Sequence, residues 1–123
     1  IIHSELETES GRIALLATHL GLKKREREIQ AEMIRDIVSE INIPLVLMCD
    51  CNEWYRGKTS RILDSCTQRA IRLRTFPSGL PLFALDSIRS RGIDINVRII
   101  KEKNIRNISD HMPIVAEGDI PVQ

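Results

Sequence analysis

The chain has 123 residues, of which 42% are hydrophobic and 28% are charged, as is usual for a globular domain. Its formal net charge of +1 argues against binding to nucleic acid or membranes through overall charge and leaves room only for local basic patches. No apolar run reaches the ~18 residues of a transmembrane helix, and no signal-peptide pattern is evident. Three cysteines without zinc-ligand spacing predict reduced thiols, so the expected location is cytoplasmic.

The first half of the chain predicts a strand-helix-strand unit. Residues 1–7 and 12–19 have the pattern of two strands joined by a turn, and the second carries a continuous apolar run. Residues 23–41 place apolar side chains at three-to-four spacing, which predicts an amphipathic helix that ends before Pro44. Residues 44–49 are again strand-like, so the strands on either side of the helix should be parallel.

The second half predicts a short helix near residues 60–65 and strands at residues 82–89, 93–99 and 112–117. The chain as a whole therefore predicts an α/β fold, layered in the α+β manner, with a mixed sheet of about six strands and helices on one face. The other face of such a sheet needs a partner layer that the predicted elements do not supply.

Polar side chains follow the predicted strands at one edge of this sheet. His19 ends the strand before the helix, and Asp50 and Asn52 follow the strand after it. Parallel strands place such residues at the same edge, and the Asp110–His111 pair joins them if the last strand is antiparallel. Each residue alone also suits a cap or an Asx turn, so the convergence is what indicates a site.

Four short segments in chain order share a pattern with a known family. They are residues 18–22 with Glu26, Arg27 and Gln30; residues 48–52; residues 75–78 with Pro81 and residues 85–88; and residues 109–113. Together they resemble the T-H-L-G-L, G-D-F-N, T-F-P-S with L-D-x-I, and S-D-H-x-P motifs of the endonuclease/exonuclease/phosphatase superfamily, which includes deoxyribonuclease-I-like nucleases. The glycine and phenylalanine of G-D-F-N are Cys49 and Cys51 here.

The resemblance implies that the protein hydrolyses a phosphodiester or phosphomonoester with Mg²⁺ or Mn²⁺, on nucleic acid or on a lipid or other small molecule. It implies that Asp50 orients or deprotonates the attacking water and that Asn52 holds this water and the phosphate. His19 would contact the phosphate or protonate the leaving group. Trp54 is a candidate for stacking on the substrate, and packing against its loop is the equal alternative.

The resemblance also assigns residues near the end of the chain. His111 would contact a phosphate oxygen or share in activating the nucleophile, and Asp86 would orient its ring. Asp110 would help to bind the cation, because carboxylate oxygens are the ligands that Mg²⁺ and Mn²⁺ prefer.

The superfamily fold is a four-layer α/β/β/α sandwich of two similar halves, and residues 1–123 match the C-terminal half. The N-terminal half, which the resemblance says supplies an Asn and the principal Glu ligand of the metal, is expected to be absent. The alternative hypothesis is therefore a truncated half-domain that is inactive alone. It would expose an apolar sheet face and form a homodimer or pair with another half.

Overall fold

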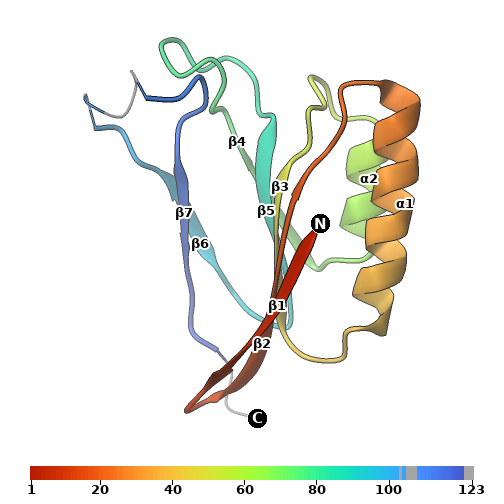
Figure 1. Ribbon diagram of the computed structural model, residues 1–123. Coiled ribbons are helices and arrows are strands. Elements are labelled where there is room, and N and C mark those ends of the chain that lie inside the picture. The colour runs from red at the N-terminus through yellow and green to blue at the C-terminus, as the bar shows by residue number, and fades with distance from the viewer. Residues whose placement is uncertain (103, 105–107, 121–123) are drawn as a thin grey trace.

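The computed structural model describes residues 1–102, 104 and 108–120. Its elements are β1 (Ile2–Thr8), β2 (Gly11–His19), α1 (Lys24–Glu40), β3 (Leu45–Asp50), α2 (Lys58–Ser65), β4 (Arg69–Leu73), β5 (Asp86–Arg91), β6 (Asn96–Ile99) and β7 (Ile114–Glu117). They form three layers, with both helices on one side of the main sheet and β6 and β7 on the other (Figure 1).

The main sheet has five strands in the order β1-β2-β3-β5-β4. Strands β2 and β3 are parallel, as the predicted strand-helix-strand unit requires, and the other pairs are antiparallel. Helix α1 buries Ala31, Ile34 and Val38, whose three-to-four spacing puts them on one side of the helix. They pack on Leu16 and Leu47 of the central strands, so the larger core lies between the helices and the sheet.

The opposite face of the main sheet carries a second, smaller core. Alternate strand residues point to this face, and Ile13, Val46 and Ile88 meet Ile95 there. The β6–β7 ladder packs over part of it, with Ile114 of β7 against the same cluster. We call the space between the main sheet and the β6–β7 ladder the interlayer gap. The smaller core fills its middle, and the functional side chains lie at one end of it.

The α/β class and the mixed sheet with helices on one face are confirmed, and the strands differ in number and grouping. The described residues form seven strands in two sheets, because β6 and β7 pair only with each other. Strand β4 was not predicted, since it is an edge strand with two arginines and little burial. Strand β5 begins at Asp86 rather than at residue 82, because residues 76–83 close a separate turn through a Phe76–Phe83 bridge.

The expectation of reduced thiols is wrong for two of the three cysteines. Cys49 and Cys51 are joined in a disulfide, and Cys66 is free. Strand β3 ends at Asp50, and the chain bends there so that the two Cα atoms lie 5.3 Å apart, within the usual range for a disulfide. The cytoplasmic location stays a prediction.

Part of the sheet face in the interlayer gap has no covering layer among the described residues. Ile2 and Leu6 of β1 pair with Ala17 and Ile13, so they share this face, and both remain exposed, as does Met48 of β3. The expected homodimer through this face stays a prediction, which sedimentation of the chain would test. No helix among the described residues is both long and apolar enough to cross a lipid bilayer.

Candidate functional site

Strand register brings three of the predicted site residues into a row. His19 at the end of β2 is the partner of Asp50 at the end of β3, and Asp50 is the partner of Asp86 at the start of β5. Partners in neighbouring strands point to the same face, which here is the face toward the interlayer gap. Parallel pairing of β2 and β3, followed by the antiparallel β5, therefore gathers one imidazole and two carboxylates at one edge of the sheet.

His111 approaches this row from the segment before β7. Its Nδ1 lies 2.7 Å from Asp86 Oδ2, and its Nε2 lies 3.9 Å from Asp50 Oδ2. His19 Nε2 lies 3.5 Å from the same Asp50 oxygen, with its ring 73% exposed. Ligand atoms of Asp50, Asp86 and His111 lie within 4.8 Å of one another, a spacing that suits a metal ion. Residues far apart in the sequence thus meet around one carboxylate.

The hydrogen bond to Asp86 sets the tautomer of His111. A carboxylate only accepts, so Nδ1 carries the proton and donates it to Asp86, which leaves Nε2 facing Asp50. Thr75, which is fully buried, donates its hydroxyl to the same Asp86 oxygen. Thr75 belongs to a motif segment but had no predicted role. Only tertiary structure shows that it holds Asp86 in place.

Asn52 joins the ends of the two parallel strands. Its Nδ2 donates to the carbonyl oxygen of Leu20 at 2.7 Å, and its backbone N–H donates to Asp50 Oδ1 at 3.2 Å. Its φ of 46° is left-handed, a conformation that Asn adopts more readily than most residues. Asn52 is 8% exposed, so besides any contact with substrate it fixes the loop that follows Asp50.

The first turns of α1 hold the loop that follows His19. Gln30 accepts the backbone N–H of Gly21 through Oε1 at 2.8 Å, and the Glu26 carboxyl group packs on the same glycine. A Cβ atom added at Gly21 would lie 2.2 Å from the Glu26 carboxyl carbon, so a side chain there would displace Glu26. The Gly21, Glu26 and Gln30 positions of the first motif therefore have a positioning role that the sequence did not reveal.

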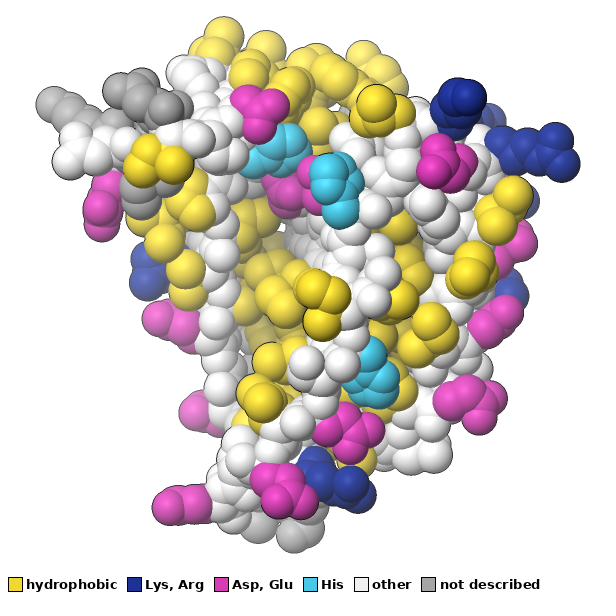
Figure 2. All heavy atoms as spheres, in the orientation of Figure 1, with side chains coloured by type: hydrophobic (Ala, Val, Ile, Leu, Met, Phe, Trp, Pro, Cys, Tyr) yellow, Lys and Arg dark blue, Asp and Glu magenta, His cyan; other side chains and the backbone are white. Residues whose placement is uncertain are grey.

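The site opens into a hollow of about 890 Å³, called the site hollow below. Asp110 and Trp54, the remaining predicted site residues, both line it, although Asp110 lies outside the group around Asp50. Trp54 is half exposed and packs edge-on against Phe76 and Phe83, at ring-centroid distances of 5.7 and 4.6 Å. Packing and substrate contact are therefore compatible for Trp54. In Figure 2 the two histidines near the top lie beside acidic side chains.

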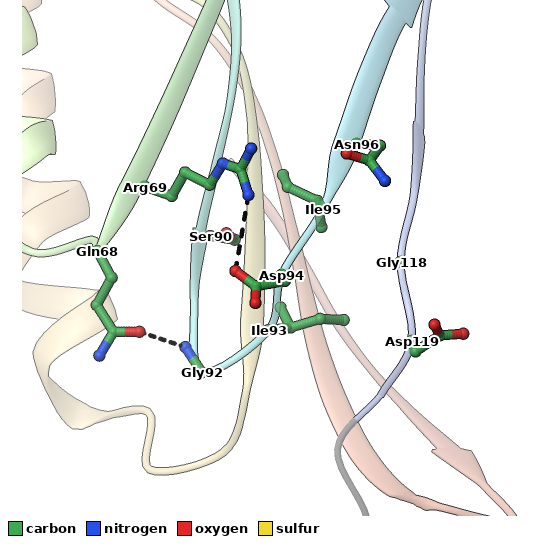
Figure 3. A pocket seen from close by; sticks show the side chains of 10 residues that line it. All are labelled: Gln68, Arg69, Ser90, Gly92, Ile93, Asp94, Ile95, Asn96, Gly118 and Asp119. Atoms are coloured by element: carbon green, nitrogen blue, oxygen red, sulfur yellow. Dashed lines mark hydrogen bonds and ion pairs between the residues drawn. The ribbon is translucent and has the colours of Figure 1, made fainter.

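A second hollow lies at the opposite end of the interlayer gap (Figure 3). Its lining carries an ion pair between Arg69 and Asp94 at 3.6 Å, and Gln68 accepts the backbone N–H of Gly92. Among the described residues, the metal-ligand type of cluster occurs only at Asp50, Asp86 and His111. The site hollow is therefore the candidate for catalysis.

The surroundings of His111 favour its protonated form. Partial burial by itself lowers the pKa of the imidazole, but the hydrogen bond to Asp86 and the charges of Asp86, Asp50 and Asp110 outweigh it. The net effect raises the pKa of His111 above its ordinary value of 6.5. The stabilisation from this charge is present below the unfolded-state pKa and is lost as pH rises through the folded-state pKa.

We expect Asp86→Asn to lower the pKa of His111, because the substitution removes both the carboxylate acceptor and its charge. An NMR titration of the imidazole signals in metal-free protein measures this pKa directly. The substitution should also destabilise the fold more at acidic pH than above the folded-state pKa. His3 on β1 serves as the internal control. A titration midpoint for His111 that Asp86→Asn leaves unchanged would contradict the assigned hydrogen bond.

Comparison with known proteins places this geometry in a wider context. No protein-family model matches the chain. The uncharacterized protein YbhP of Escherichia coli strain K12 is 30% identical over 115 residues, which cover 85% of this chain and 46% of YbhP. The corresponding protein of Shigella flexneri matches to the same extent. The chain thus spans about half the length of the curated relatives that it matches.

Solved structures give a likeness in fold. An endonuclease/exonuclease/phosphatase from Bacteroides vulgatus has a TM-score of 0.71 at 17% identity, over 89% of this chain and 50% of that one. Beta toxin from Staphylococcus aureus with bound magnesium ions has a TM-score of 0.72 at 15% identity, over 95% and 57%. A mannosyl-6-phosphatase from Bacteroides thetaiotaomicron has a TM-score of 0.63 at 14% identity, over 88% and 51%. The resemblance in the sequence is therefore confirmed at the level of the fold: this chain has the fold of about one half of a protein of the endonuclease/exonuclease/phosphatase superfamily.

Proposed function

We propose that the intact protein hydrolyses phosphate esters with the help of a divalent cation bound at the site hollow. The observation that carries this proposal is the convergence of His19, Asp50, Asp86 and His111 at one sheet edge, within 2.7 to 3.9 Å of one another in successive pairs. A phosphate ester is anionic and repels nucleophiles. Its hydrolysis therefore needs a carboxylate that orients water and cationic or proton-donating groups that face the phosphoryl oxygens.

In this proposal Asp50 orients the attacking water and accepts its proton. Asp50 is the carboxylate that lies within 4 Å of both imidazoles, and its second oxygen is held by the backbone N–H of Asn52. A carboxylate fixed in this way presents a constant direction to a water molecule in the hollow. Asn52 keeps its side-chain oxygen and one N–H free of described partners, so it can also contact that water or the phosphate.

The two imidazoles lie on either side of Asp50 and have different roles. His111, held protonated by Asp86, donates from Nε2 to a phosphoryl oxygen or to the departing group. Asp86 acts through His111 and is a positioning residue, fixed in turn by Thr75. His19 is exposed at the mouth of the hollow and is placed to contact the phosphate or to protonate the leaving oxygen. Trp54 forms a wall on which the organic part of a substrate would rest.

The chemistry of the donor groups fits Mg²⁺ or Mn²⁺. Asp110 is exposed, lines the hollow and makes no ion pair with another described residue, whereas Asp86 is engaged by His111 and Thr75. We therefore propose Asp110 as one ligand from this chain, beside the group of Asp50, Asp86 and His111 whose spacing also suits a cation. A bound divalent cation would neutralise the negative charge that grows on the phosphoryl oxygens. Asp50 and Asp86 face the imidazole of His111 and Glu26 packs on Gly21, so we propose that further ligands come from a second half-domain.

We infer that this chain is the C-terminal half of the catalytic domain and that a second half completes the site. The chain spans 46% of its curated relatives and about half of the solved structures that share its fold. The exposed apolar face of the interlayer gap, with Ile2, Leu6 and Met48, is where a second sheet would pack. Activity is therefore expected of the intact protein rather than of the isolated half.

The proposal is tested by hydrolysis of bis-p-nitrophenyl phosphate and p-nitrophenyl phosphate by the intact protein. We expect activity with Mg²⁺ or Mn²⁺, loss of activity on addition of EDTA, and recovery when the cation is restored in excess. The absence of metal-dependent cleavage of these esters, and also of DNA, lipid and sugar phosphates, would remove the proposal.

A further inference from the structure

The loops around the site hollow expose several large apolar side chains. Twelve large hydrophobic residues among the described part of the chain are exposed, and six of them lie in these loops. We call these six the apolar rim: Leu22, Trp54, Tyr55, Leu80, Leu82 and Ile108. Each is at least 48% exposed, so the rim is an apolar surface in contact with water rather than the edge of a core.

Contacts between the loops place the rim around the mouth of the hollow. Leu22 and Trp54 line the hollow itself. Leu80 and Leu82 lie in the turn closed by the Phe76–Phe83 bridge, and Trp54 packs on both of these phenylalanines. All these loops lie at the upper edge of the molecule in Figure 1, and Figure 2 shows hydrophobic side chains exposed along that edge.

The turn that carries Leu80 and Leu82 is fixed to the segment that carries the site. Ser78 donates its backbone N–H to the carbonyl oxygen of Asp110 at 2.7 Å, and its hydroxyl to the carbonyl oxygen of Ser109 at 2.7 Å. Ile108 belongs to the same segment and directly precedes Ser109. The rim and the catalytic group are therefore held in one arrangement, so whatever contacts the rim also faces the hollow.

Basic side chains flank the rim. Lys23, Lys24 and Arg25 are exposed directly after Leu22, and Arg74 is exposed before Phe76. Among the described residues, none of these four cations forms an ion pair with a carboxylate. Figure 2 shows Lys and Arg side chains at the right end of the apolar upper edge. Apolar side chains with unpaired cations beside them are complementary to a surface that is apolar within and anionic outside.

We propose that the apolar rim docks on the surface of an anionic phospholipid bilayer and that the substrate is a phosphate ester in a lipid headgroup. Exposed leucine and isoleucine side chains gain little from nucleic acid or a free sugar phosphate, whereas they lose water contact when they enter the headgroup boundary. Trp54 and Tyr55 suit the same boundary, where an aromatic ring with a polar end is favoured.

Docking by the rim is distinct from the packing of a second half-domain. Ile2, Leu6 and Met48 lie on the flat sheet face that another sheet would cover, whereas the rim residues lie in loops beyond the strand ends. A bilayer approached from that end would present headgroup phosphates to His19, Asp50 and His111 without deep insertion of the protein. This inference rests on the proposed phosphoesterase function for its substrate, but docking itself needs neither metal nor turnover.

The test is co-sedimentation of the intact protein with vesicles in EDTA, so that no turnover occurs. We expect binding to phosphatidylcholine vesicles that contain phosphatidylglycerol, weaker binding without it, and weakening by salt. The double variant Leu80→Ser/Leu82→Ser should bind at least about tenfold more weakly. Ile29→Ser/Met33→Ser, which removes two exposed apolar side chains from α1, is the matched control and should bind as the wild type does. Circular dichroism and thermal unfolding check that both variants are folded.

Several outcomes would overturn docking. They are no binding to either vesicle, equal binding by wild type and the Leu80→Ser/Leu82→Ser variant, or equal losses in both double variants. Binding to duplex DNA in preference to vesicles would also overturn it and would make the rim a nucleic-acid surface. Hydrolysis of the two nitrophenyl esters and of DNA, lipid and sugar phosphates with Mg²⁺ or Mn²⁺ is measured separately. Vesicle binding without that hydrolysis would leave docking in place and remove the proposed function, and hydrolysis without vesicle binding would do the reverse.

Discussion

Asp50→Asn is expected to lower kcat for phosphate-ester hydrolysis by the intact protein about 10²- to 10⁴-fold. The substitution keeps the size of the side chain and an oxygen that accepts the Asn52 N–H, but it removes the charge that accepts a proton from water. Asp50 is also the group that both imidazoles face, at 3.5 and 3.9 Å. Steady-state kinetics with bis-p-nitrophenyl phosphate and saturating Mn²⁺ measure the effect.

Asp94→Asn is the matched control for this prediction. Asp94 is a carboxylate at the opposite end of the interlayer gap, where it pairs with Arg69 and lies outside the site hollow. We expect its kcat to stay at the wild-type value. Equal thermal unfolding of the two variants would show that any loss in Asp50→Asn is chemical rather than structural. Activity of Asp50→Asn close to that of the wild type would exclude Asp50 as the base and leave the role to another group.

The strand-helix-strand unit could be predicted because its periodicities are strong. Strand β3 is a continuous apolar run whose first three residues are buried on both faces of the sheet, and α1 shows one apolar stripe. Strand β4 gave no such signal, because an edge strand with Arg69 and Arg72 is stabilised by backbone pairing with β5 rather than by burial. The separate β6–β7 ladder was likewise invisible, since alternation shows that a strand is half buried and not which sheet it joins.

Some parts of the site could likewise be predicted from local patterns, and others depended on tertiary structure. His19 and Asp50 could be expected at one edge because the strands that they end were predicted to be parallel. His111 was placed there on the assumption that β7 runs antiparallel in the same sheet; it reaches the site from the other layer instead. Thr75 and the bond from Asn52 to Leu20 join segments more than ten residues apart, and no local pattern encodes such a contact. The positioning roles of Thr75 and of the Asn52–Leu20 bond were therefore missed, whereas Asp86, Asn52 and His111 themselves were predicted.

Arg89 supports the site from the helix side, and we expect Arg89→Ala to lower the free energy of unfolding by about 2–5 kcal/mol. The side chain is fully buried between β5 and α2, where Nε donates to Asp64 at 3.0 Å. Its Nη1 contacts Cys51 and Ser87, the residues that follow Asp50 and Asp86. Truncation to Ala leaves a void directly behind the two carboxylates. Denaturant unfolding measures the loss, and Arg61→Ala on the exposed side of α2 should change stability by less than about 0.5 kcal/mol.

Arg89→Met separates the volume of this side chain from its charge. Burial lowers the pKa of the Arg89 guanidinium more than the bond to Asp64 raises it, and its Nη2 has no hydrogen-bond partner among the described residues. Burying the charged guanidinium therefore lowers the free energy of unfolding relative to an apolar side chain of similar size. If Arg89 were replaced, Asp64 would keep its second ion pair, with Arg56. Met fills most of the space without burying a charge, so it should destabilise much less than Ala. If Met proves as harmful as Ala, the guanidinium hydrogen bonds rather than the packing hold β5 and α2 together, and the carboxylates at the site depend on a buried charge.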